Sequence, residues 1–213
     1  MLGNFRQNMN EYFRANIVAY FFMTLIFVIG VAVGALAVKT LPEDQKLELI
    51  NYLKVFFQGL VQGPGSVDTP ALFTTVALSS VKTIGLIWLL GFTVVGIPFV
   101  LFIVFTRGFV IGFTVGFLVN EYIMKGLVFA LASVLPHNFF AVPALLAAGV
   151  AATSFSLLLV RRKQRAKVNL LYESVGYTVF CLLMLALMLA AAVIEVYISP
   201  VFMKLVAGLL LKQ

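Results

Sequence analysis

The sequence predicts an all-α protein, a polytopic transmembrane helical bundle with about five membrane-spanning helices. Of its 213 residues, 62% are hydrophobic and only 11% are charged, and the mean hydropathy is +1.10. Soluble domains contain about 45–50% apolar and about 25% charged residues, so the apolar excess requires a lipid solvent. The apolar residues also fall in long runs, as expected for helices that cross a bilayer. Residues 1–213 are therefore expected to form a single transmembrane domain.

The first crossing is expected at residues 17–38, which carry no charge. As a helix this run is about 33 Å long, enough for the hydrocarbon core. A cleaved signal peptide is the alternative, because Arg6 and Arg14 precede the run and residues 35–37 have the spacing of a cleavage site. The run exceeds the roughly 7–15 apolar residues of a signal peptide, so a retained helix is favoured.

Residues 39–80 form a long polar stretch that is expected to be an extracytoplasmic loop. Pro42, Glu43 and Asp44 are residue types that favour a helix N-terminus. Apolar residues then recur at helical spacing, which predicts an amphipathic outer helix. Its apolar face either packs on the membrane surface or binds a partner, and the candidate partner-binding residues are Leu47, Ile50, Leu53 and Phe57.

The second crossing is expected at residues 81–105, with a kink near Ile97 caused by Pro98. Arg107 follows this run and is interpreted as a cytoplasmic anchor of the topology. Residues 108–160 must then cross twice, because Arg107 and the basic residues after position 160 should face the same side. The last crossing, at residues 170–198, is expected to carry Glu195 to the outer interface.

The chain is expected to reverse between a short crossing at 108–119 and a full one at 139–160. Residues 120–138 are interpreted as a short re-entrant or interfacial helix near the outer face. The candidate interfacial turn consists of Pro136, His137 and Asn138. For the histidine, proton or ion handling is the functional alternative, and an imidazole bonded within a turn is the favoured structural one.

A basic cluster separates the last two crossings and sets the predicted orientation. It includes Arg161, Arg162, Lys163 and Arg165. Because cytoplasmic loops carry excess Lys and Arg, this loop and the N-terminus are expected in the cytoplasm and the C-terminus outside the cell membrane. The same placement explains the net charge of +7 without nucleic-acid binding.

Glycines recur at four-residue spacing in two apolar runs, at Gly30, Gly34, Gly108, Gly112 and Gly116. Such faces let helix backbones approach closely in lipid, where apolar burial drives little association. These residues are expected to pack helices together. Packing within one chain is favoured, and a homo-oligomer is the alternative.

Catalytic constellations are missing from the sequence. There is no HExxH motif, no phosphate-binding loop and no evident nucleophile–base pair, so no catalytic residue is assigned. One His and one Cys are too few for a usual zinc site, so neither a metal nor a cofactor is expected. The chain is predicted not to be an enzyme and to act through partners and the lipid bilayer.

Two stretches carry a resemblance to a known family. Residues 81–99 read VKTIGLIWLLGFTVVGIPF and residues 107–138 read RGFVIGFTVGFLVNEYIMKGLVFALASVLPHN, and both are similar to the stage II sporulation protein M family. The resemblance implies a membrane scaffold in the engulfment of the forespore. It also implies recruitment of two extracytoplasmic peptidoglycan hydrolases, an amidase-endopeptidase and a lytic transglycosylase.

The wider superfamily has Pro-His-Gly-x-x-Glu in the turn, whereas this chain has Asn138 and Ala141 at the glycine and glutamate positions. Because the acid is missing, any transport activity of wider members is not carried over. A permease-like subunit is nevertheless the alternative from the residues, because Pro98 and a re-entrant segment are features with which transporters line cavities.

Overall fold

The computed structural model describes residues 2–62, 69–161 and 170–202, and this part of the chain is helical without a β-strand. The helices in chain order are α1 (Leu2–Ala37), the 3₁₀ turn η1 (Val38–Thr40), α2 (Glu43–Gln62), α3 (Thr69–Gly91), α4 (Gly96–Arg161), α5 (Leu170–Val193) and the π-helical turn η3 (Ile194–Ile198). The expected all-α transmembrane class is confirmed.

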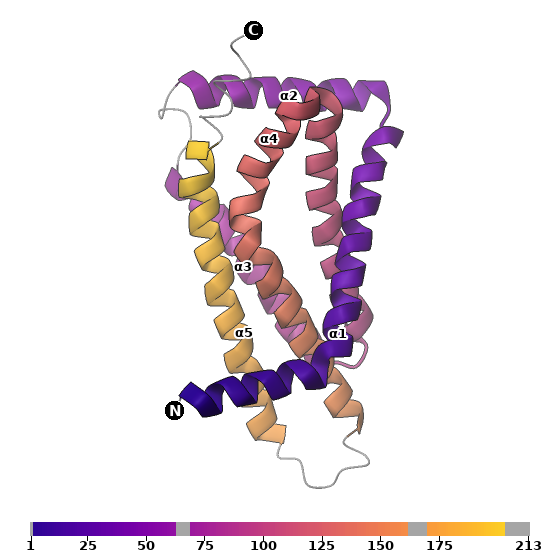
Figure 1. The fold of residues 1–213 in the computed structure, drawn as a ribbon, viewed down its shortest axis with the longest axis vertical. Coiled ribbons are helices and arrows are strands. Elements are labelled where there is room, and N and C mark those ends of the chain that lie inside the picture. The colour runs from indigo at the N-terminus through magenta and orange to yellow at the C-terminus, as the bar shows by residue number, and fades with distance from the viewer. Residues whose placement is uncertain (1, 63–68, 162–169, 203–213) are drawn as a thin grey trace.

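Helix α4 is a hairpin, and this explains how the described helices form a bundle. Four helices are long and apolar enough to cross a membrane, over Asn16–Thr40, Pro70–Gly91, Gly96–Val160 and Leu170–Phe202. The third of these is 65 residues long, about 98 Å as one straight helix and far longer than a bilayer is thick. Its helical geometry breaks at Ile123, with φ 49° and ψ −123°, and Figure 1 shows the two limbs running in opposite directions.

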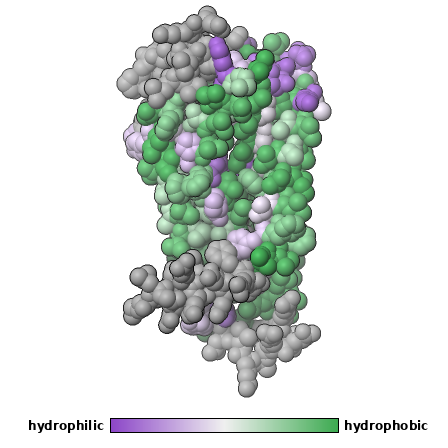
Figure 2. Space-filling view, viewed as in Figure 1, coloured by the Kyte–Doolittle hydropathy of each residue, from purple (hydrophilic) through white to green (hydrophobic). Residues whose placement is uncertain are grey.

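Figure 1 also shows α2 lying across one end of the bundle and the N-terminal part of α1 lying across the other. The remainder of α1, α3, both limbs of α4 and α5 run between these two ends. Figure 2 shows apolar surface along the height of the bundle and the strongest hydrophilic colour at the end where α2 lies. This distribution is that of a membrane protein whose apolar side chains face lipid.

The second crossing ends earlier than the sequence indicates. Helix α3 stops at Gly91 and α4 begins at Gly96, so the boundary lies at residues 92–95. Pro98 consequently falls in the first turn of α4, where a missing backbone donor costs little, and it kinks no crossing. Arg107 then lies inside the first limb of α4, and its interpretation as a cytoplasmic cap is wrong.

Side chains from two other segments satisfy the carbonyls at this boundary. The Ser156 hydroxyl lies 2.8 Å from the Gly91 carbonyl and 3.1 Å from that of Thr93. The Tyr177 hydroxyl lies 3.2 Å and 3.1 Å from the carbonyls of Ile87 and Trp88. Because unpaired backbone groups are costly in lipid, these contacts permit a helix to end here.

The predicted interfacial turn at Pro136, His137 and Asn138 is wrong. All three residues are helical and belong to the second limb of α4, while the reversal occurs thirteen residues before Pro136, at Ile123. The ring of Pro136 removes one backbone donor, and the nearby Asn138 Nδ2 donates to the Val134 carbonyl at 2.9 Å. The carbonyl that Pro136 leaves without its helical donor is that of Ala132, and a transmembrane helix tolerates proline where neighbouring groups satisfy the freed carbonyl.

The five predicted glycines bring α1 and the first limb of α4 together within one chain. A methyl group built at Gly30 would overlap the Phe105 carbonyl, and one at Gly34 would overlap the Phe109 carbonyl. The contacts from α4 are reciprocal. A methyl group built at Gly108 would overlap the Phe27 carbonyl, one at Gly112 would overlap the Val31 carbonyl, and one at Gly116 would press on Ala35. Backbone therefore contacts backbone along the crossing, which is the packing expected of small-residue faces in lipid.

The second limb of α4 supplies the other small-residue face. Ala144, Ala148 and Ala152, spaced by one helical turn, are each fully buried. They belong to a core shared with Met23 of α1 and with residues of α3, the first limb of α4 and α5. The hairpin thus packs against α1, α3 and α5 at once.

Adding one methyl group to the α1–α4 contact should destabilise the protein. We expect Gly112→Ala to lower the free energy of unfolding by about 2 kcal/mol or more, because the Val31 backbone cannot move aside cheaply. Gly176→Ala is the matched control, since a Cβ there meets nothing within 4 Å and should be neutral or stabilising by about 0.5–1 kcal/mol. Denaturation in detergent micelles measures both, and equal effects would contradict the contact.

Candidate functional site

Helix α2 is the extramembrane element best placed to meet a partner. It begins after Pro42, with Glu43 and Asp44 in the first turn, where acids complement the helix dipole. The Lys46 backbone N–H donates to the Pro42 carbonyl at 3.0 Å, so the proline carbonyl accepts the first helical bond. The helix predicted for this loop is therefore present.

One face of α2 is attached to the tip of the α4 hairpin. Lys46 Nζ lies 3.0 Å from Glu121 Oε1, two residues before the reversal at Ile123. Leu53 packs on a small cluster consisting of Leu118, Phe129 and Ala130. A hydrogen bond to Glu121 raises the pKa of Lys46 above its ordinary value, so the ammonium is retained at neutral pH.

The structure divides the four candidate partner-binding residues. Leu47 is 56% exposed, Ile50 is half-buried and Leu53 packs inward on the hairpin tip. The side chain of Phe57 lies outside the described residues. The opposite side of the helix carries Leu47 together with Tyr52 and Val55, which are 69% and 68% exposed. These three side chains are called the outer face of α2 below, and Leu53 is not part of it.

A second candidate site lies among the membrane-spanning segments. It is a polar pocket of about 240 Å³ between α3, the first limb of α4 and α5. The residues that line this pocket are Thr75, Val76, Ser79, Ser80, Thr83, Arg107, Met188 and Glu195. A charged pair of opposite sign and four hydroxyls thus face one space inside the bundle.

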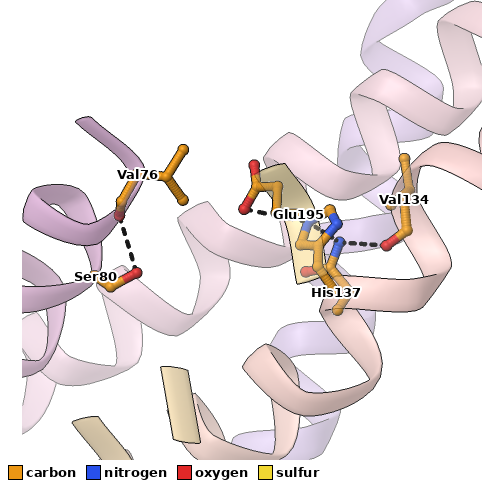
Figure 3. A network of polar contacts seen from close by, with 6 residues as sticks. Val76, Ser80, Val134, His137 and Glu195 are labelled. Atoms are coloured by element: carbon orange, nitrogen blue, oxygen red, sulfur yellow. Dashed lines mark hydrogen bonds and ion pairs between the residues drawn. The ribbon is translucent and has the colours of Figure 1, made fainter. Parts of the chain in front are cut away.

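His137 of the second α4 limb adjoins this pocket through Glu195. Its Nε2 lies 4.0 Å from Glu195 Oε2 and 3.0 Å from Asn138 Nδ2. Figure 3 shows Glu195 between His137 on one side and Val76 and Ser80 of α3 on the other. The predicted residues His137 and Asn138 are therefore brought together with Glu195, inside the bundle and away from any turn.

Sequence interpretation missed this convergence. Arg107 was expected at a cytoplasmic boundary and Glu195 at the outer interface, but both line the polar pocket. One sequence signal for the site exists in α3, where Thr75, Ser79 and Thr83 recur every four residues and therefore share one face of an apolar helix.

The remaining predicted residues contribute less to a site. Arg161 is the last residue of α4, and Arg162, Lys163 and Arg165 lie outside the described residues. Within the described ranges, no group of three His, Cys, Asp or Glu side chains is arranged to hold a metal ion. The candidate functional sites are therefore the outer face of α2 and the polar pocket.

Removing the Lys46 charge should loosen α2 from the hairpin tip. We expect Lys46→Met to broaden the distance distribution between spin labels at Gln45 and Met124, whereas Lys39→Met, at an exposed lysine outside α2, should leave it unchanged. The folded pKa of Lys46 is raised above the ordinary value of 10.5. The ion pair with Glu121 therefore stabilises the folded state fully below that pH, and this stabilisation is lost as pH rises through the folded pKa. A distance distribution that is already broad at neutral pH in the protein that retains Lys46 would contradict the ion pair.

Comparisons with known proteins identify the family. The family model described as Stage II sporulation protein M matches residues 23–200, which include the hairpin, the polar pocket and all of α2. No curated protein and no solved structure matches the chain. Because the family model covers most of the chain, the protein belongs to the stage II sporulation protein M family, a family of sporulation membrane proteins.

Proposed function

We propose that the protein is an integral membrane scaffold of the engulfment machinery, which recruits extracytoplasmic peptidoglycan hydrolases through the outer face of α2. The hydrolases are an amidase-endopeptidase and a lytic transglycosylase, as the family resemblance implies. The observation that carries this proposal is the attachment of α2. One side is held by the Lys46–Glu121 ion pair and the Leu53 contact, while the outer face remains exposed.

The proposed location is the septal and engulfing mother-cell membrane, crossed several times by the chain. The basic residues between α4 and α5 support a cytoplasmic position for that connection, and hence for the N-terminus. An odd number of crossings then puts α2 and the C-terminus outside. This orientation presents α2 to the compartment that contains peptidoglycan.

The chemistry of the outer face supports a protein partner. Tyr52 and Val55 project large apolar groups next to the exposed acids Glu43, Asp44 and Glu48. Exposed aromatic and aliphatic groups ringed by charge are typical of protein interfaces. The acids further favour a partner whose docking face is basic.

Truncating the outer face should release the partners. We expect Tyr52→Ser combined with Val55→Ser to reduce co-purification of both hydrolases from sporulating cells at least tenfold, because exposed anchors dominate such interfaces. The membrane level of the protein should not change, since neither side chain is buried. Tyr172→Ser combined with Val175→Ser is the matched control, with the same residue types, the same spacing and similar exposure on α5.

Full co-purification by the α2 double variant would refute this docking face. Leu53→Ala serves as a contrast, because Leu53 packs against Leu118 and Phe129. It should lower thermal stability before it alters partner binding. Loss of partners without any loss of stability in Leu53→Ala would instead show that the inward side of α2 is the interface.

A permease-like subunit is the second candidate, and the polar pocket is the observation that favours it. Arg107, Glu195 and four hydroxyls at the depth of membrane-spanning helices resemble a substrate or proton pathway more than lipid-facing surface. Proteoliposomes containing a pH-sensitive dye test this function under an imposed potential. Proton uptake that Glu195→Gln abolishes would support it, and uptake equal to that of empty liposomes would exclude proton transport.

A further inference from the structure

Among the described residues, no side chain or carbonyl pairs with the arginine that lines the polar pocket. Arg107 is half-buried and, among the described residues, makes no hydrogen bond or ion pair. A charged side chain within a membrane-spanning helix is costly to insert into a bilayer, so one that makes no ion pair indicates a function. Its planar guanidinium is suited to bidentate recognition of a phosphate or carboxylate.

Three of the four α3 hydroxyls that line the pocket can act there only as acceptors, and one is available as a donor. Thr75, Ser80 and Thr83 donate to carbonyls of their own helix at 2.9, 3.1 and 2.9 Å. Their oxygens therefore offer lone pairs to the pocket. The Ser79 hydroxyl makes no hydrogen bond in the described part of the chain, although the Ser79 carbonyl accepts from Thr83, so this hydroxyl is available to donate beside Arg107.

Glu195 supplies the opposite charge. Among the described residues its one ion-pair contact is with His137, at 4.0 Å, which is beyond hydrogen-bond distance. The carboxylate side chain is 35% exposed and lines the same pocket as Arg107. The pocket therefore presents an anion-binding group and a cation-binding group to one ligand.

We propose that the polar pocket binds a small zwitterion of the phosphoethanolamine type, with its phosphate on Arg107 and Ser79 and its ammonium on Glu195. The volume of about 240 Å³ accommodates a headgroup of this size. Binding of this ligand is separate from partner recruitment by α2, and it does not require that the ligand crosses the membrane.

The polar pocket opens on the α3 side of the bundle. Thr75 lies six residues, about 9 Å, below the start of α3, and Glu195 lies seven residues, about 10 Å, before Phe202. Thr75 and Ser79 are themselves exposed on the α3 side. Arg107 lies near the middle of its limb, eleven residues after the start of α4 and sixteen before Ile123, so a headgroup or a free zwitterion reaches it from the exposed α3 side of the pocket.

Two buried polar atoms lie near Glu195 and His137. Among the described residues, Asn138 Oδ1 and Ser199 Oγ are buried without a hydrogen-bond partner. Ser199 lies one helical turn after Glu195, and Asn138 contacts His137, so both belong to the same neighbourhood. Buried polar groups of this kind are normally satisfied by ordered water or a bound group, which supports an occupied, polar site.

Native mass spectrometry of the detergent-purified chain tests the proposal with three probes: dihexanoyl-phosphatidylethanolamine, dihexanoyl-phosphatidylglycerol and free phosphoethanolamine. The ethanolamine lipid should bind at least tenfold more tightly than the glycerol lipid, because only the former has an ammonium for Glu195. Equal affinity for the two lipids, or no binding of either ethanolamine probe, would overturn the proposal. These comparisons use the unsubstituted protein and do not depend on the folding of any variant.

Two variants assign the charges. Arg107→Gln should weaken the binding of both lipids at least tenfold. Glu195→Gln should remove the preference for the ethanolamine lipid and retain binding of the phosphate. Lys82→Gln and Glu173→Gln are the matched controls, since both are exposed charges on α3 and α5 that do not line the pocket. Unchanged affinity in Arg107→Gln would overturn the assignment of the phosphate.

Free phosphoethanolamine distinguishes the source of the ligand. If it binds as tightly as the lipid, the site recognises a soluble zwitterion, and if only the lipid binds, the acyl chains hold the headgroup in place. Either result supports the shared chemistry. Thermal stability of each variant, measured in the same detergent, separates a loss of binding from a loss of fold.

Discussion

Close backbone contact between α1 and the first limb of α4 is the interaction on which the rest of the structure depends. In lipid, apolar burial gives little drive for helices to associate, so van der Waals contact must hold them together. Gly30 and Gly34 on one helix and Gly108, Gly112 and Gly116 on the other permit that contact. The helices meet without intervening side chains, and the position of the limb is set along most of its length.

Both candidate sites are carried by this limb. Its end beside α2 holds Glu121, which binds Lys46 and so positions α2, and its middle holds Arg107, which lines the polar pocket. A rigid limb therefore relates a surface outside the bilayer to a polar space inside it.

Satisfaction of backbone carbonyls decides where helices end in this protein. At residues 92–95 the chain turns because Ser156 and Tyr177 supply donors from segments far away in sequence. At Pro136 the helix continues within a limb whose residues, among them Ala144 and Ala148, are buried against neighbouring helices. Proline and isolated charge are local signals, and neither reports whether a distant donor is present. For this reason the sequence misplaced both boundaries.

The sequence by itself determined the membrane class, the amphipathic α2, the glycine faces and the family, because these depend on composition and local periodicity. Tertiary structure decided that Leu53 points to the hairpin tip while Tyr52 and Val55 remain exposed. It also decided that Arg107, His137 and Glu195 meet within the bundle. These three residues lie on separate segments, and only the packing of those segments determines whether a charge faces lipid, water or another charge.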